Sequence, residues 1–247
     1  MDSKSDAAPP EIARQIVVSG ASDVPRVGDT RLHDMLSGPE RKALNAIGSV
    51  DTYPNADMTI FREGDRARNL YAIASGIVRI CRHLDGLDRQ VLSFLWPGDI
   101  FGLIGDDGLY VNCASTVSAA RIHRFPLNRL EPMLLRNPRL QCHLLIKINH
   151  DLRAAQRQII TLGHADTYHR LASFLIEMIQ HAASSEPDGV RLRLPMARND
   201  IADYLGTTPE TVSRGLQRME REGIMRRISP RVLKFEDLSG LLRLARR

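Results

Sequence analysis

Three polar residues near the end of the chain have the types and the spacing needed to read the edges of DNA bases. Glu210, Ser213 and Arg214 stand three and four positions apart, so on a helix they lie together on one face. An arginine can donate two hydrogen bonds to guanine, a glutamate can accept one from cytosine N4, and a serine can contact a neighbouring base. The set therefore suits a G·C pair. The alternative is a solvated helix face with a Glu210–Arg214 ion pair.

A second group of polar residues surrounds these three and is suited to auxiliary contacts, mainly with phosphates. Such contacts give affinity and orientation but carry no sequence information. Residues 196–247 hold eleven Arg or Lys against seven Asp or Glu, so this segment carries a surplus of four of the net charge of +5. The candidates for auxiliary or backbone contacts are Arg198, Thr208, Thr211, Gln217, Arg218, Arg226, Arg227 and Arg231.

Local signals predict the two helices that would position these residues. Gly206 can take the positive φ of a sharp turn, Thr208 is a natural N-cap, Pro209 fits the first helical position, and Gly223 suits the end of the second helix. At the start of the first helix Ala197 offers no capping side chain, and Asp200 offsets this only in part. The predicted order is helix 198–204, turn 205–208, helix 209–222 and hairpin 224–235, which is the layout of a winged helix-turn-helix.

A long helix is predicted upstream, between the cap residue Asn137 with Pro138 and the next glycine, Gly163. Its apolar residues recur at alternating steps of three and four, as in a coiled-coil seam. This ridge is too long for one small β domain to cover, so pairing with a second copy of the chain is preferred over packing against the chain's own C-terminal part. The seam residues are Leu145, Ile148, Leu152, Ala155, Ile159 and Leu162.

The segment from residue 51 to residue 125 has the pattern of a β-roll. Short β-rich runs are separated by glycine turns, which is typical of a jelly roll or barrel. The expected strands are 70–73, 77–81, 91–95 and 121–125. After the long helix, Leu171 to Ile179 predict another helix, residues 184–189 a polar loop, and Leu192 and Leu194 a short strand.

The three cysteines, Cys81, Cys113 and Cys142, stand far apart and show neither zinc-site spacing nor a disulfide framework. Cys81 and His83 form a Cys-x-His pair that we expect on a hairpin surface, where two residues make no closed metal site. All three thiols are expected to be structural. Redox activity is the alternative, with Cys142 the more interesting candidate because it lies at the expected dimer surface.

Composition points to a soluble, cytoplasmic protein. The longest apolar runs are too short to span a membrane, and the N-terminus lacks the features of a signal peptide. The sequence contains no GxGxxG, phosphate loop, nucleophile elbow or HExxH motif, so an enzyme is not expected.

In their order along the chain, these motifs resemble the CRP/FNR superfamily of transcription regulators, and the Glu-x-x-Ser-Arg pattern is similar to its FNR and FixK branch. Further markers lie upstream, at residues 63–65, Gly76, 97–102 and 170–175. The resemblance implies an α+β fold with a cyclic-nucleotide-binding-like β-roll, a dimerisation helix and a winged helix-turn-helix. It also implies a homodimer that binds inverted TTGA-like half-sites on double-stranded DNA and contacts RNA polymerase.

The sensing residues of this family are replaced here. Gly102-Leu103-Ile104 stands where cyclic-nucleotide binders carry a ribose contact, and Tyr110-Val111 stands near their phosphate contact. The chain has no cysteine before Cys81, which argues against an iron–sulfur cluster. We therefore expect no cofactor and no metal, with a haem- or thiol-based gas or redox sensor of the same fold as the alternative. The expected divisions are a flexible extension 1–28, a β-roll 29–137, a dimerisation helix 138–163 and a DNA-binding domain 164–247.

Overall fold

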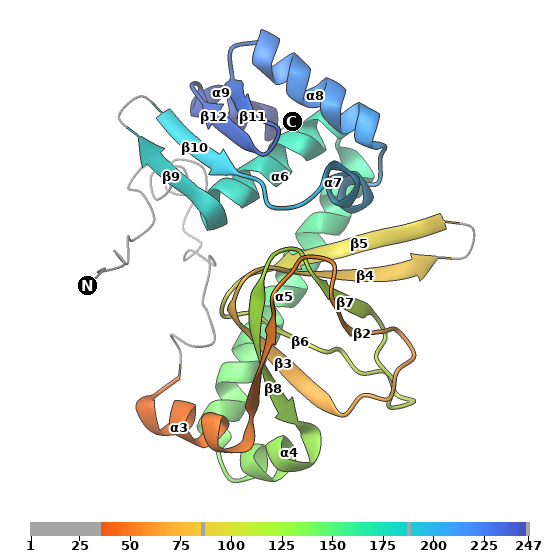
Figure 1. The fold of residues 1–247 in the computed structure, drawn as a ribbon, viewed down its shortest axis with the longest axis vertical. Helices are drawn as coiled ribbons and strands as arrows, with labels where there is room; N and C mark the ends of the chain where they lie inside the picture. The colour runs from red at the N-terminus through yellow and green to blue at the C-terminus, as the bar shows by residue number, and fades with distance from the viewer. Residues whose placement is uncertain (1–35, 85–86, 187–188, 246–247) are drawn as a thin grey trace. The chain divides into compact units, whose positions relative to one another are not determined.

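The computed structural model describes residues 36–84, 87–186 and 189–245 (Figure 1). The described chain divides into two compact units, one ending at Gln158 and the other beginning at Ile159. The expected N-terminal extension, residues 1–28, lies outside the described residues. Among the helices of the described part, none has both the length and the apolar character required to cross a membrane.

The first unit is built on two four-stranded antiparallel sheets (Figure 1). Their strand orders are β1-β8-β3-β6 and β2-β7-β4-β5. The elements are α3 Gly38–Ile47, β1 Ser49–Tyr53, β2 Thr59–Phe61, β3 Asn69–Ser75, β4 Val78–Leu84, β5 Leu87–Leu95, β6 Ile100–Phe101, β7 Cys113–Thr116, β8 Ala120–Pro126 and α4 Leu127–Leu135. The expected β-roll is confirmed, and the four predicted strands correspond to β3, β4, β5 and β8.

Several elements of this unit were not predicted, because each is short and carries little pattern. Strand β7 contains only small residues, and α4 has a proline, Pro132, inside it. Helix α3 follows a local signal that can be read from the sequence. Ser37 caps it by accepting a hydrogen bond from the backbone N–H of Glu40, whose carboxylate accepts from the N–H of Ser37 in return.

Aromatic side chains fill the interior of the roll. Phe61, Tyr71, Phe101 and Tyr110 are all buried, and the ring centroids of Phe61 and Tyr110 lie 4.0 Å apart. The ring centroids of Phe61 and Tyr71 lie 5.3 Å apart, and those of Tyr71 and Phe101 lie 5.2 Å apart. The Tyr110 hydroxyl donates to the backbone oxygen of Asn69 at 2.8 Å. The space between the two sheets is therefore occupied by the chain's own rings.

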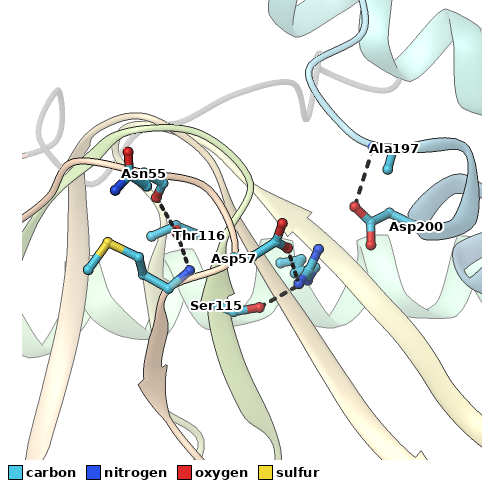
Figure 2. A network of polar contacts seen from close by, with 8 residues as sticks. Asn55, Asp57, Ser115, Thr116, Ala197 and Asp200 are labelled. Atoms are coloured by element: carbon cyan, nitrogen blue, oxygen red, sulfur yellow. Dashed lines mark hydrogen bonds and ion pairs between the residues drawn. The ribbon is translucent and has the colours of Figure 1, made fainter.

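Charged and polar contacts fasten the loop between β1 and β2 to the sheet (Figure 2). Arg79 of β4 donates to Asp57 at 2.6 Å and to the Ser115 hydroxyl at 2.9 Å. The Thr116 hydroxyl donates to the backbone oxygen of Asn55 at 2.8 Å. Asp57 has a φ of +62°, a conformation that aspartate tolerates better than most residues. This loop thus acquires its shape from long-range contacts.

Helix α5 spans Pro138–His164, close to the predicted bounds, and crosses the boundary between the two units. Its Lys147 is buried, and the Nζ atom lies 2.8 Å from Asp99 Oδ1 and 2.6 Å from Asp151 Oδ1. Burial by itself lowers the pKa of Lys147, but the two carboxylates more than offset this, so that its pKa is raised. Asp99 also accepts from the backbone N–H of Trp96. One cation therefore joins α5 to the turn before β6.

The second unit combines four helices with one antiparallel sheet in the order β11-β12-β10-β9 (Figure 1). Its elements are α6 Thr167–Ala182, β9 Ala183–Glu186, β10 Gly189–Arg193, α7 Arg198–Leu205, α8 Pro209–Arg221, β11 Met225–Ser229, β12 Val232–Phe235 and α9 Leu238–Ala245. The predicted loop over residues 184–189 is wrong, because residues 183–186 pair with β10 as an edge strand. The hydrogen bonds to β10 thus make residues 183–186 a strand, although their polar composition favours a loop. Helix α9 was not predicted.

Replacing Lys147 with methionine should destabilise the protein. The substitution keeps the side-chain volume but leaves the carboxylates of Asp99 and Asp151 facing each other without a cation, at a cost of about 3 kcal/mol in the free energy of unfolding. Urea unfolding followed by circular dichroism measures this. Lys42→Met, on the exposed face of α3, is the matched control and should change little. Equal midpoints for the two variants would contradict a structural role for this cation.

Candidate nucleic-acid interface

The turn between α7 and α8 has the geometry of a helix-turn-helix. Gly206 adopts the left-handed conformation, with φ +61° and ψ +48°, and its N–H bonds to the Ala202 oxygen at the end of α7. The Thr208 hydroxyl then accepts from the backbone N–H of Thr211 at 3.2 Å, and Pro209 opens α8. The predicted turn and caps are confirmed. These local bonds fix where α8 begins.

The start of α7 is capped as the sequence indicated. Ala197 occupies the N-cap position without a side-chain hydrogen bond, and its backbone N–H donates to Asp200 Oδ2 at 3.3 Å (Figure 2). Of the two reciprocal hydrogen bonds of a capping box, only the one from the Ala197 N–H to the Asp200 carboxylate is therefore present. Because Asp200 is buried, this carboxylate sits inside the motif and not on its surface.

Helix α8 buries one face and exposes the other. Val212, Leu216 and Met219 are almost completely buried, together with Ile201 and Leu205 of α7. The outward side chains are the predicted ones: Glu210, Arg214, Gln217 and Arg218 are exposed, and Ser213 is half-buried. The apolar stripe thus holds the helix while its polar face stays open.

The three predicted base-reading residues lie within one turn and a half of the start of α8. The Ser213 hydroxyl donates to the Pro209 oxygen at 2.8 Å, which leaves its oxygen able to accept from a base. The Arg214 guanidinium donates to the Thr211 hydroxyl at 3.1 Å. The pKa of Glu210 is lowered, first by its own backbone N–H, then by the Thr208 hydroxyl and the Arg214 charge, so it is an anionic acceptor at neutral pH.

Arg218, predicted as an auxiliary DNA contact, is engaged within the chain. Its Nε lies 2.8 Å from Glu222 Oε1, and its guanidinium carbon lies 4.1 Å from the ring centroid of Tyr168. The Tyr168 hydroxyl donates to Glu222 Oε2 at 2.6 Å. This network joins the C-terminal half of α8 to α6. Arg218 therefore holds in place the helix that carries Glu210, Ser213 and Arg214.

Three arginines gather beside the β11–β12 hairpin, the wing of the motif. Arg198 Nη2 donates to the Pro230 oxygen at 2.8 Å. Burial lowers the pKa of Arg198, and the charges of Arg227 and Arg231 lower it further, so both positive charges act on this guanidinium. Glu220 offsets part of this charge through its ion pair with Arg227, and the remaining positive charge favours an anion.

Arg226 lies apart from these three. Side chains of successive strand residues point to opposite faces, so Arg226 and Arg227 face opposite ways on β11. Arg227 pairs with Glu220 of α8 at 2.8 Å, whereas Arg226 lies 3.6 Å from Glu236. Of these four predicted phosphate contacts, Arg226 therefore lies apart from the other three.

The predicted seam of α5 is largely open to solvent in the single chain. Leu145, Ile148, Leu152 and Ile159 are each more than half exposed, at 64%, 54%, 55% and 68%. Ala155 is also exposed, and Leu162 is half-buried.

One of the three cysteines does not lie where it was expected. Cys81 and Cys113 are buried, so placing Cys81 on a hairpin surface was wrong: strand β4 turns that side chain into the sheet's covered face. Cys142, on α5, is exposed.

Two residues that position the motif were not recognised from the sequence. Arg170 of α6 donates to the Leu205 oxygen at 2.7 Å, at the end of α7. A Cβ atom on Gly215 would lie 2.7 Å from a methyl carbon of Leu171, so α8 approaches α6 closely at this point. Spacing alone could not identify either residue, since both roles depend on the packing of α6 against the motif.

The comparisons with known proteins agree with this architecture. Residues 54–137 match the model of the cyclic nucleotide-binding domain, and residues 169–244 match that of the Crp-like helix-turn-helix domain. The chain is 35% identical over 186 residues to the nitrogen fixation regulation protein FixK of Azorhizobium caulinodans, covering 75% of each. It is 30% identical over 188 residues to the transcriptional activator FnrA of Stutzerimonas stutzeri, covering 76% of this chain and 77% of FnrA.

Among solved structures, FixK2 of Bradyrhizobium japonicum is similar at 28% identity and a TM-score of 0.71, covering 80% of this chain and 97% of FixK2. A CooA mutant of Carboxydothermus hydrogenoformans shares the fold at a TM-score of 0.74 and 23% identity, covering 89% of this chain and 98% of CooA. A β-roll, a long helix and a helix-turn-helix define a class of DNA-binding transcription regulators. The chain belongs to the CRP/FNR family of these regulators, and its relatives are not enzymes.

Replacing Gly215 with alanine should separate α8 from α6. The added methyl would meet the buried Leu171 side chain, and overpacking of this kind costs about 1–3 kcal/mol in the free energy of unfolding. Gly163→Ala in α5 is the control, since a Cβ there meets nothing within 4 Å and alanine is the better helix former. Thermal unfolding should move in opposite directions for the two variants. A Gly215→Ala protein as stable as the parent would show that the close approach is not constraining.

Proposed function

We propose that this protein regulates transcription as a homodimer that binds an inverted repeat of TTGA-like half-sites and contacts RNA polymerase, with no bound cofactor required. The observation that carries the proposal is the exposed polar face at the start of α8, where Glu210 and Arg214 stand one turn apart. A recognition helix meets base edges with its N-terminal residues. The half-site and the polymerase contact come from the resemblance to the FNR and FixK branch.

The base-reading roles divide by chemistry. Arg214 donates to guanine O6 and N7, Glu210 accepts from cytosine N4, and Ser213 accepts from or contacts a neighbouring base. Glu210 is suited to this role because its lowered pKa keeps it charged without an internal ion pair of fixed geometry. Together the residues select the G·C pair of the half-site.

The wing arginines supply affinity. A phosphate near Arg198, Arg227 and Arg231 is attracted by three positive charges, one of them partly offset by Glu220, and counterion release adds to the binding. Arg226, which faces the other side of the strand, contributes less. Thr208, Thr211 and Gln217 make auxiliary polar contacts around the base-reading residues.

The seam of α5 is the proposed dimer contact. Four large apolar side chains of the predicted seam are more than half exposed, a stripe that water disfavours and that a second copy of the same helix would cover. A helix of 27 residues extends about 40 Å, which is long enough for a two-stranded coiled coil. A two-fold axis along this seam gives the symmetry that an inverted repeat requires.

The β-roll interior does not fit a cyclic nucleotide. Tyr110 stands near the position of the family's phosphate contact, but its ring is buried against Phe61 and its hydroxyl is bonded to the Asn69 backbone. Leu103, at the position of the ribose contact, is apolar and exposed. These residues offer neither a guanidinium for a phosphate nor a carboxylate for a ribose. We infer that the cytoplasmic protein acts through its own abundance or through a different signal.

Selection of bound DNA from a random library by the purified, ligand-free protein tests the proposal. Enrichment of an inverted TTGA-like repeat is expected. Enrichment only after addition of a cyclic nucleotide or haem would overturn the cofactor-free reading, and an unrelated motif would overturn the base-reading assignment.

Arg214→Ala should lose the preference for the G·C pair, at a cost of about 1–3 kcal/mol on the preferred site. Arg231→Ala should instead weaken all sequences alike and reduce the slope of log K against log salt by about one. Fluorescence anisotropy with matched and mismatched duplexes at several salt concentrations measures both. The loss of affinity caused by Arg226→Ala should be smaller than the loss caused by Arg231→Ala. Identical specificity profiles for Arg214→Ala and Arg231→Ala would refute the division of roles.

Ile148→Glu should dissociate the dimer, because the seam would then bury two carboxylates near its two-fold axis. Multi-angle light scattering should give the monomer mass, and affinity for the inverted repeat should fall while the fold is retained. Ala154→Glu, on a different and exposed face of α5, is the matched control and should remain dimeric. A dimeric Ile148→Glu protein would place the interface elsewhere.

A further inference from the structure

Two buried cysteines of the β-roll face each other across neighbouring strands. Cys81 of β4 and Cys113 of β7 are directly opposite partners in the antiparallel pairing of these strands. Both side chains are buried, with exposed fractions of 4% and 8%. Nothing in the DNA-binding role uses them, and they are far apart in the sequence.

The backbone geometry is compatible with a bond between the two sulfurs. Directly opposite residues of an antiparallel pair have Cα atoms about 4.5 or 5.5 Å apart, and disulfides form at Cα separations of about 4.4–6.8 Å. The Cys113 Sγ lies 2.9 Å from the backbone oxygen of Cys81, so its side chain reaches across to the neighbouring strand. Only side-chain rotation is needed to join the sulfurs.

The surroundings of the pair make the two thiols unequal. The Cys81 thiol can donate a hydrogen bond to a Cys113 thiolate, and this interaction lowers the pKa of Cys113; His83 acts in the same direction. The same interaction, together with burial, raises the pKa of Cys81. A thiolate beside a protonated partner is the arrangement of an attacking and a resolving cysteine, and Cys113, the first residue of β7, is the less enclosed of the two.

The sheet around the pair also has an irregularity. The pairing of β4 with β5 shifts register between Ile80 and Cys81, which locally interrupts the ladder. Cys113 is the first residue of β7, next to the loop that precedes this strand. Local opening here would admit an oxidant as small as a peroxide, although the two thiols are covered on average.

We propose that Cys81 and Cys113 form a peroxide-oxidisable dithiol that closes to a disulfide within the β-roll. The Cys113 thiolate attacks one oxygen of hydrogen peroxide, the O–O bond breaks, and the released hydroxide takes up a proton to become water. The resulting sulfenic acid is attacked by the Cys81 sulfur, the S–O bond breaks, and a second water leaves with the Cys81 proton. Two thiols lose two electrons and two hydrogens, and one peroxide becomes two waters.

The exposed Cys142 gives a different product. It has no cysteine opposite it on its own helix, so oxidation there leads to a sulfenic acid or to a bond between two copies of the chain. The proposed disulfide is intramolecular and therefore independent of protein concentration, which separates the two reactions.

Peptide mass spectrometry of the full-length Cys142→Ser protein tests the proposal. The reduced protein is treated with hydrogen peroxide, unfolded in the presence of an alkylating agent and digested with trypsin without reduction. Because cleavage follows Arg79, Arg82, Arg89 and Arg121, the disulfide joins peptide 80–82 to peptide 90–121. The linked pair should weigh two hydrogens less than its parts and should disappear after dithiothreitol.

Single substitutions assign the roles. Cys81→Ser should leave a sulfenic acid on Cys113 that dimedone labels, whereas Cys113→Ser should leave Cys81 largely alkylatable. Circular dichroism of both variants confirms that the sheet is intact. Full alkylation of both thiols in the Cys142→Ser protein, at a peroxide concentration that oxidises Cys142 in the unsubstituted protein, would overturn the proposal. So would a disulfide in the unsubstituted protein that joins either residue to Cys142 only.

Discussion

The packing of α8 against α6 and α7 is the constraint on which DNA recognition depends. Val212, Leu216 and Met219 bury one stripe of α8, and the missing side chain of Gly215 lets the helix approach Leu171 closely. Since a helix can present only one face to the groove, burying this stripe decides which residues point outward. At the C-terminal end of the same helix, the Arg218–Glu222–Tyr168 network adds polar contacts that hold α8 against α6. The orientation of the predicted base-reading residues is thus set by contacts on the opposite face of α8 and at its C-terminal end.

Much of this motif could be predicted from the sequence, because its determinants are local. The cap at Thr208, the proline after it and the left-handed Gly206 act within a few residues, and the helix seam repeats along one element. The parts that could not be predicted depend on residues distant in the sequence. The register that sets Cys81 opposite Cys113, and the contact from Arg170 to the end of α7, exist only after strands and helices have paired. Short elements such as β6, with two residues, carry no period to detect.

Stacked rings fill the interior of the β-roll, and Tyr110 is turned inward. In the proposed function, a signal acts on this domain through chemistry at the sheets or through surface contacts. The cysteine pair lies in the sheet β2-β7-β4-β5, where covalent linkage of β4 to β7 would stiffen strands that also carry Arg79 and its bonds to the β1–β2 loop.

Helix α5 supplies a physical route from the β-roll to the rest of the chain. The buried Lys147 binds Asp99 in the turn before β6, and Asp151 one turn along the helix shares the same cation. Because an unpaired charge at this depth is costly, the helix cannot rotate about its axis without losing the contact with Asp99, whereas Asp151 moves together with Lys147. Lys147 and the apolar seam residue Ile148 are neighbours in sequence and therefore face about 100° apart around the helix. The rotational position of the exposed seam is thus set by an ion pair with the roll, and a change in the Asp99 turn would alter how this seam is presented in the proposed dimer.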